Sequence, residues 1–323
     1  MNTLSHPHSL SLSRPAFLAG SLAAVAAPAL AADLTTVRIA GTPDADLVGA
    51  LWGVHSGLFA RAGLDVQVQR LNSGAAVSAG VIGGSVDVGK SSVFGLIAAY
   101  VKGVPLVLEA VADVYDTKAP NTGFVVAKTS AINGPRDLAG KTIASPALGD
   151  LFSTVSAAWI DANGGNSHAS NFVELPIPLA MNALAAGRID GAMMVDPYFQ
   201  QAKDSGTCRV IGHPFDSIAK YFGVTYYFCV RSYAQANPDV LARFRRTLAA
   251  ASTYALAHQH EMAPVIVDYT KLDRALIDRL PLGIGVGMDQ APLQAVIDFA
   301  ARIKSIPASF PATDIIDPAA LTR

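Results

Sequence analysis

The chain has 323 residues, of which 51% are hydrophobic and 15% charged, enough apolar residues to build the cores of two modest lobes. The formal net charge is −1 and no block of Lys or Arg is present, which argues against nucleic acid or an anionic membrane as a partner. Beyond the N-terminal region, no segment is apolar for long enough to span a bilayer.

The first 31 residues are predicted to be a signal peptide rather than part of the fold. Arg14 precedes an apolar run over 16–27, and Ala29-Leu30-Ala31 is a small-x-small cleavage site. The sequence at 13–18 resembles the twin-arginine export motif, but Pro15 occupies the position of the second arginine. The Sec and twin-arginine routes therefore both stay open, and the mature protein is expected outside the cytoplasm.

Strands and helices are predicted to alternate from residue 36 to about 230. The first block has predicted strands at 36–40, 64–71, 86–89 and 106–110, and predicted helices at 47–58, 76–82 and 93–101. The second block has predicted strands at 123–127, 142–144, 172–175, 189–195, 208–211 and 226–230, and predicted helices at 151–163 and 179–186. This alternation predicts an α/β fold with mainly parallel sheets and helices on both faces.

After Pro238 only helices are predicted, at 239–258, 263–269 and 292–303. Cys208 and Cys229 both lie on apolar, strand-like runs. A disulfide between them is permitted outside the cytoplasm, but two buried free thiols are favoured, because strand geometry restricts which cysteines can be bridged.

Two junctions share one order of elements: a helix, a glycine stop, a short strand with an aspartate, and a polar loop. The first runs from Gly83 through Asp87 to Ser92, and the second from Gly187 through Asp190 to Tyr198. In open α/β sheets, ligands collect at the carboxyl ends of the strands, near helix N-termini. Two such edges predict two sheets facing one another across a cleft. The two aspartates inside the junctions are assigned to structural hydrogen bonds.

The chain resembles periplasmic substrate-binding proteins of ABC importers, in the nitrate/sulfonate/taurine/pyrimidine-precursor (SsuA-like) branch. The residues that carry the resemblance are G-L-F at 57–59, A-G-L-D-V at 62–66, G-S-V-D-V-G at 84–89, D-L-A-G-K-T-I at 137–143, A-L-A-A-G-R-I-D-G-A at 183–192 and D-P-Y at 196–198. The resemblance implies a type II periplasmic-binding fold with a helical C-terminal tail. Carried over to this chain, lobe 1 is 33–119 plus 229–323, and lobe 2 is 120–228.

The predicted ligand-binding residues lie at strand C-termini and helix N-termini. They are Thr42, Asp44, Asn72, Ser73, Gly74, Ser91, Ser92, Ser145, Leu148, Gly149, Asp150, Asp196, Tyr198 and Tyr226. Lys90 is the one cation on these loops, and carboxylates oppose a bare dianion but suit an amine or a ring N–H. A small organic ligand is therefore favoured over nitrate or sulfate, and a taurine-like sulfonate stays possible.

Three enzyme-like patterns are set aside. The residues from Gly84 to Ser91 match the P-loop sequence pattern letter for letter. A P-loop needs a strand before its first glycine and a phosphate-wrapping loop between its glycines. Here a helix is predicted before Gly84 and a strand is predicted between the two glycines. His258 and Glu261 are at helical spacing for a metal but are interpreted as an exposed polar face. The related pyrimidine-synthase enzyme carries a cysteine cluster for iron, which two cysteines do not match.

The resemblance implies a periplasmic protein that binds a small molecule without catalysing a reaction and delivers it to an ABC permease in the inner membrane. No cofactor, metal or nucleic acid is expected, and the protein is expected to be a monomer. The alternatives are a sensory ligand-binding protein that acts on a membrane receptor and, more remotely, a pyrimidine-synthase-like enzyme.

Overall fold

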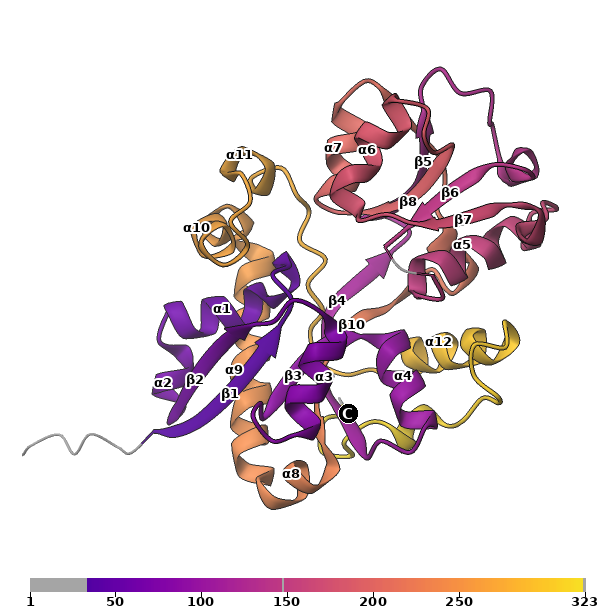
Figure 1. The fold of residues 1–323 in the computed structure, drawn as a ribbon. Coiled ribbons are helices and arrows are strands. Elements are labelled where there is room, and N and C mark those ends of the chain that lie inside the picture. The colour runs from indigo at the N-terminus through magenta and orange to yellow at the C-terminus, as the bar shows by residue number, and fades with distance from the viewer. Residues whose placement is uncertain (1–33, 147, 322–323) are drawn as a thin grey trace, which may run out of the picture. The chain divides into compact units, whose positions relative to one another are not determined.

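Two five-stranded sheets organise the residues that the structure describes, 34–146 and 148–321 of this computed structural model (Figure 1). The predicted signal peptide at 1–31 lies outside the described residues. Both sheets belong to the same unit of the chain, which begins at Leu34. We call each sheet with its covering helices a lobe.

The first sheet has the strand order β2-β1-β3-β10-β4. β1 pairs in parallel with β2 and β3, whereas β10 runs antiparallel between β3 and β4. Its strands are β1 (Thr35–Gly41), β2 (Leu64–Arg70), β3 (Val88–Ser92), β4 (Leu106–Asp116) and β10 (Tyr221–Val230). Its early helices are α1 (Val48–His55), α2 (Leu58–Arg61), α3 (Gly74–Ile82) and α4 (Val93–Val101).

The second sheet has the strand order β7-β6-β8-β5-β9. β6 pairs in parallel with β7 and β8, whereas β5 runs antiparallel between β8 and β9. Its strands are β5 (Thr122–Ala127), β6 (Thr142–Ser145), β7 (Asn171–Glu174), β8 (Gly191–Val195) and β9 (Cys208–Gly212). Its helices are α5 (Leu151–Ala162), α6 (Ile177–Ala185) and α7 (Tyr198–Asp204).

The C-terminal part is helical, as predicted. Its helices are α8 (Arg231–Ala236), α9 (Pro238–Ala257), α10 (Gln259–Thr270), α11 (Arg274–Ile277) and α12 (Gln290–Arg302). Short 3₁₀ turns occupy Ala45–Leu47, Pro135–Leu138, Ser167–Ala169, Pro214–Ser217 and Ala312–Asp314. Among the described helices, none combines the length and the apolar character that a membrane crossing requires.

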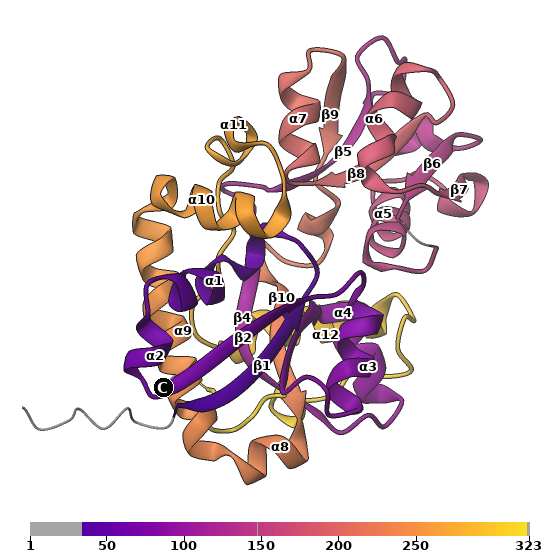
Figure 2. The ribbon, with the colours of Figure 1, turned by 60° about the vertical axis from the view of Figure 1, so that its left-hand side comes forward.

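Helices cover both faces of each sheet, which buries apolar side chains on both sides of the strands. In the first lobe, α1, α2 and α9 pack on one face and α3, α4 and α12 on the other (Figure 2). In the second lobe, α6 and α7 pack on one face and α5 on the other. Covering both faces allows central strands such as β5 and β8 to be apolar almost throughout, which explains why they read as short apolar runs.

The element types agree with the sequence predictions, but several details were wrong. The sheets are mixed rather than mainly parallel, because β10 and β5 each run against their neighbours. The strand predicted at 86–89 runs from Val88 to Ser92. The helix predicted at 47–58 divides into α1 and α2 because Gly57 adopts a left-handed conformation, with φ of +71°.

The lobe boundaries stay a prediction. The predicted boundary at residue 229 falls inside β10, which already pairs with the first sheet from Tyr221 onwards. The other predicted boundary, at 119–120, falls between the end of β4 and the start of β5. The two cysteines lie on different sheets, Cys208 on β9 and Cys229 on β10, and both are buried free thiols, as predicted.

Asp87 and Asp190 have the same structural role in the two lobes, as predicted. Asp87 accepts a hydrogen bond from the Arg38 backbone N–H (2.8 Å) and donates its own N–H to the Arg38 carbonyl (2.9 Å). Asp190 exchanges the same pair of bonds with Thr142, at 2.8 and 2.8 Å. Each aspartate thereby fixes the start of a parallel strand pair, β1 with β3 and β6 with β8.

Replacing these aspartates tests the shared role. The Asp87 carboxylate also binds the Arg38 guanidinium at 2.6 and 3.0 Å and is 11% exposed, whereas Asp190 is 39% exposed. We expect Asp87→Ala to lower the free energy of unfolding by about 2–3 kcal/mol and Asp190→Ala by about 1 kcal/mol. Urea denaturation measures both values, and the absence of any loss in either variant would contradict the structural role.

Candidate functional site

A cleft of about 630 Å³ opens where strand ends of the two lobes meet. The first lobe lines it with the segments that follow β1, β2 and β3, and the second lobe with the segments that follow β6, β7 and β8. The described lining residues are Thr42 to Asp46, Asn72, Gly74, Lys90 to Ser92, Asp113, Asn121, Pro146, Leu151, Phe152, Ile177, Val195 to Pro197, Val224, Thr225 and Leu280 to Ile284.

Half of the predicted site residues line this cleft. They are Thr42, Asp44, Asn72, Gly74, Ser91, Ser92 and Asp196. Six of the seven belong to the first lobe, at the ends of β1, β2 and β3, and Asp196 follows β8 in the second lobe. The structure therefore brings the two junctions of the sequence together at one cavity. That these residues bind a ligand stays a prediction.

The other predicted residues have different positions. Ser73 caps α3 by accepting a hydrogen bond from Ala76 N–H, at 3.1 Å. Asp150 caps α5 in the same way and also accepts the Ser145 hydroxyl, at 2.9 Å. Tyr198 begins α7 outside the set that lines the cleft, and Tyr226 is 2% exposed in the core.

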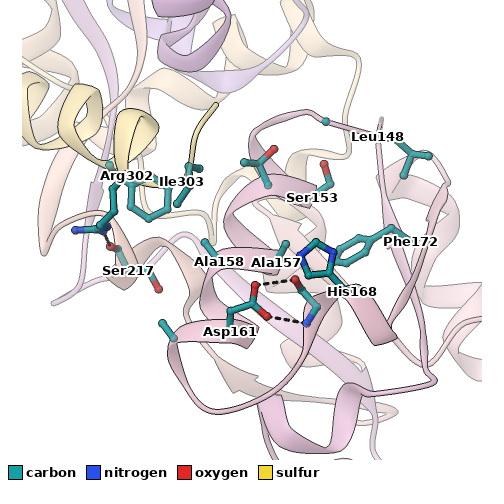
Figure 3. Close-up of a pocket in the computed structure, with 15 residues that line it drawn as sticks. Leu148, Ser153, Ala157, Ala158, Asp161, His168, Phe172, Ser217, Arg302 and Ile303 are labelled. Atoms are coloured by element: carbon teal, nitrogen blue, oxygen red, sulfur yellow. Dashed lines mark hydrogen bonds between the residues drawn. The ribbon is translucent and has the colours of Figure 1, made fainter. Parts of the chain in front are cut away.

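Leu148 and Gly149 line a second, separate cavity of about 740 Å³ between α5 and α12 (Figure 3). Its charged groups are already engaged: Asp161 accepts two hydrogen bonds from Ser167 (2.7 and 2.8 Å), and Arg302 donates to the Ser217 carbonyl (3.0 Å). Because its polar groups bind one another, this larger cavity is a weaker site than the cleft at the strand ends.

Lys90 organises the first-lobe side of the cleft. Its side chain is 1% exposed, and Nζ lies 2.8 Å from the Asp46 carboxylate, 3.2 Å from Asp44 and 3.1 Å from the Thr42 hydroxyl. Thr225 on β10 donates a further hydrogen bond to Asp46, at 2.8 Å. Burial acts to lower the pKa of Lys90, but the carboxylates of Asp46 and Asp44 raise it above its usual value, so the ammonium stays charged.

The surroundings of Lys90 also argue against the P-loop pattern. A helix, α3, rather than a strand precedes Gly84, and Gly89 to Ser91 lie within β3 rather than at the start of a helix. A P-loop lysine reaches toward phosphate, whereas Lys90 is already bound by two carboxylates.

The sequence prediction missed Asp46, Asp113 and Asn121. Asp113 lies on β4, which was predicted to end at residue 110 but continues to Asp116. Burial, reinforced by the nearby Asp46 carboxylate, raises the pKa of Asp113 well above its usual value. An aspartate within an apolar strand was the available signal. Asn121 carried no such signal, since it lies in the connection between β4 and β5.

The segment 280–284, distant in sequence, closes one side of the cleft. Val114 N–H donates to the Gly283 carbonyl (2.7 Å), and Gly285 N–H donates to the Ala112 carbonyl (3.0 Å). A methyl group at Gly283 would collide with the Asp113 carboxylate and crowd the Asn121 amide. Only glycine therefore allows this segment to lie so close to β4.

Asp196 is the principal acidic group on the second-lobe side. Its backbone N–H donates to the Asn121 carbonyl (2.9 Å), and its Oδ1 accepts the Gln200 N–H (3.0 Å). Oδ2 is buried and has no hydrogen-bond partner among the described residues. Burial raises the pKa of Asp196 to about 6, although Lys203 opposes the shift.

His258 and Glu261, interpreted from the sequence as an exposed polar face, both contact Tyr254 at the surface. The His258 ring stacks on Tyr254 at 4.0 Å, and the Tyr254 hydroxyl donates to Glu261 at 2.7 Å. Within 34–146 and 148–321, no three His, Cys, Asp or Glu side chains are grouped as metal ligands.

Lys90→Met tests the buried ion pairs. Removal of the ammonium leaves the largely buried Asp46 carboxylate without its counter-ion, and we expect a loss of about 2–4 kcal/mol in the free energy of unfolding at pH 7. Urea denaturation measures the loss, with the exposed Lys128→Met as the matched control. A loss no larger than that of the control would show that the network does not stabilise the fold.

Asp196→Asn tests the cost of ionising Asp196. The folded-state pKa of about 6 lies above the usual 3.8, so the folded state holds the proton more tightly between pH 4 and 6. Ionisation above pH 6 therefore destabilises the fold. We expect the variant to be more stable than the wild type by about 1–3 kcal/mol at pH 7 and equally stable near pH 4. Lower stability of the variant at pH 7, measured by urea denaturation, would mean that the carboxylate is structural.

Comparison with known structures supports the architecture. SsuA, the periplasmic aliphatic sulphonate binding protein from Escherichia coli, is 19% identical, with a TM-score of 0.73 over 89% of this chain and 94% of SsuA. NrtA, the periplasmic nitrate-binding protein from Synechocystis PCC 6803, is 14% identical, with a TM-score of 0.70 over 89% of this chain and 87% of NrtA.

The CA3427 gene product from Candida albicans, described as having the generic periplasmic binding protein fold, is 13% identical, with a TM-score of 0.70 over 90% of this chain and 98% of that one. At these identities the likeness establishes the two-lobe periplasmic-binding-protein fold. No curated protein has a significant sequence match to the chain. Residues 44–262 match the family described as NMT1/THI5 like, and the chain therefore belongs to that family.

Proposed function

We propose that the protein is the periplasmic solute-binding component of an ABC importer. The observation that carries the proposal is the cleft at the strand ends, which both lobes line with polar side chains. Structural neighbours include binding proteins for aliphatic sulphonate and for nitrate, which supports the assignment. The proposed ligand is a small organic molecule, either sulfonate- or taurine-like or a nitrogen heterocycle, and the protein acts as a monomer after export.

The mechanism is binding without chemistry. The ligand first contacts the groups of one lobe, and a hinge motion then brings the other lobe onto it. Binding favours the closed form only by the difference in affinity between the closed and open forms. β4 and β10 belong to the first sheet and lead into and out of the second lobe, so they are the proposed hinge strands. The closed form then docks on an inner-membrane permease, which accepts the ligand.

The arrangement of cysteines supports a binding protein over the pyrimidine-synthase-like alternative. That enzyme uses a cysteine cluster, whereas the only two cysteines of this chain are Cys208 and Cys229, which lie on different sheets. A sensory role would use the same cleft and the same closure, and differs only in the membrane partner.

A ligand screen tests the function. We expect one class among taurine, alkanesulfonates, nitrate, pyrimidines and aromatic acids to raise the melting temperature by mass action, and small-angle X-ray scattering to show a smaller radius of gyration with that ligand. A shift with ATP and magnesium alone would contradict solute binding.

Asp196→Ala should weaken binding of that ligand about tenfold or more while the protein stays folded, because one buried charged acceptor is lost. Isothermal titration calorimetry measures the affinity.

Uptake of the ligand by cells that lack the protein should fall. Normal uptake together with a loss of chemotaxis toward the ligand would identify a sensory protein instead.

A further inference from the structure

The cleft has more carboxylates than cations. Its acidic and basic lining residues in the described part of the chain are Asp44, Asp46, Asp113, Asp196 and Lys90. Lys90 is already bound by both Asp44 and Asp46. No other lysine or arginine lines the described part of the cleft, so a ligand would meet no unpaired positive side chain there.

The cleft also contains hydrogen-bond acceptors that no described residue satisfies. Asn121 is 7% exposed, and its Oδ1 is buried without a partner, as are Asp196 Oδ2 and the Ser92 hydroxyl. The Asn121 Nδ2 group lies 3.5 Å from the Val114 carbonyl, and Oδ1 is the amide atom that has no partner among the described residues. An amide oxygen and a carboxylate oxygen accept hydrogen bonds, and their missing partners are therefore donors.

The two residues that carry the free acceptors are neighbours. The Asp196 backbone N–H donates to the Asn121 carbonyl, which places both residues at the point where β5 and β8 begin to pair. Asp113 is on β4 in the first sheet, and a methyl group added at Gly283 would meet both its Oδ1 and the Nδ2 of Asn121, so Gly283 lies next to both side chains. Asn121, Asp196 and Asp113 thus line the same part of the cleft.

From this convergence we propose that the ligand carries a positively charged nitrogen with N–H groups, such as an ammonium, an amidinium or an aminopyridinium, which donates to Asn121 Oδ1 and Asp196 Oδ2. The proposal rests on the solute-binding function above and specifies its ligand class. A sulfonate or nitrate without such a nitrogen brings only acceptors, and it would leave both buried oxygens unpaired beside carboxylates. An acidic group elsewhere on the ligand is compatible, because the N-termini of α3 and α4 begin at the cleft edge.

A matched pair of probes tests the proposal on the wild-type protein. Taurine and isethionate share a two-carbon sulfonate and differ only in an ammonium or a hydroxyl at the other end. Agmatine and 4-aminopyridine present a charged nitrogen without a sulfonate, and ethanesulfonate and nitrate present an anion alone. We expect at least one nitrogen-bearing probe to bind in calorimetry at pH 7.5, and taurine to bind at least tenfold more tightly than isethionate.

Variants then locate the interaction. Asp196→Asn keeps the oxygen that binds Gln200 N–H but removes the charge, and Asn121→Leu removes the amide oxygen while its backbone carbonyl still pairs with Asp196. We expect each substitution to raise the dissociation constant of the nitrogen-bearing probe by about ten- to hundredfold. Asp268→Asn, at an exposed aspartate on α10, is the control that should leave binding unchanged. Urea denaturation confirms that each variant is folded.

The outcomes separate the ligand class from the function. Equal binding of taurine and isethionate, or binding of the anions alone, would overturn the proposal that the ligand carries a charged nitrogen. The solute-binding function would still stand. Binding of a nitrogen-bearing probe that neither variant weakens would also overturn it, because the contact would lie elsewhere. No binding by any of the six probes would count against both the ligand class and the solute-binding function.

Discussion

The buried ammonium of Lys90 is the interaction on which the first-lobe side of the cleft depends. It joins β3 to Asp44 and Asp46, which follow β1, and through Asp46 to Thr225 on β10. Removal of one member of a buried ion pair leaves an uncompensated charge. The resulting loss of stability is larger than the net stabilisation that the intact pair provides. The network therefore fixes three neighbouring strands at the edge where the ligand is proposed to bind.

The same network determines the charge that the cleft presents. Because Lys90 is saturated by two carboxylates, it offers no free positive charge to an anion. Asp113 and Asp196 are then the acidic groups of the cleft that have no lysine partner there, and burial raises the pKa of each. A raised pKa means that these groups are destabilised as bare anions, and a positively charged ligand would remove that cost. Binding energy would thus come partly from relief of an unfavourable state of the unliganded protein.

The cleft is assembled from segments that are far apart in the chain. Asn121 lies in the connection from β4 to β5, Asp196 follows β8, and the 280–284 segment reaches β4 from the helical C-terminal part. Each segment is anchored by backbone hydrogen bonds, and the Asp196 carboxylate is also held by the Gln200 N–H. This rigidity suits a receptor, because groups already in place lose little conformational entropy when the ligand binds.

Local patterns in the sequence determined the elements and half of the site. Alternating and apolar runs, glycine stops and helix caps predicted the strands and most helices. The repeated junction predicted that Asp87 and Asp190 have structural roles. It also predicted that Ser91, Ser92 and Asp196 approach one cleft. Tertiary structure alone decided that β10 and β5 run antiparallel, that Asp113 and Asn121 join the site, and that Tyr226 is buried away from it. The physical reason is that strand direction and side-chain environment depend on which distant segments pair, and pairing is set by the packing of whole sheets rather than by any short stretch of residues.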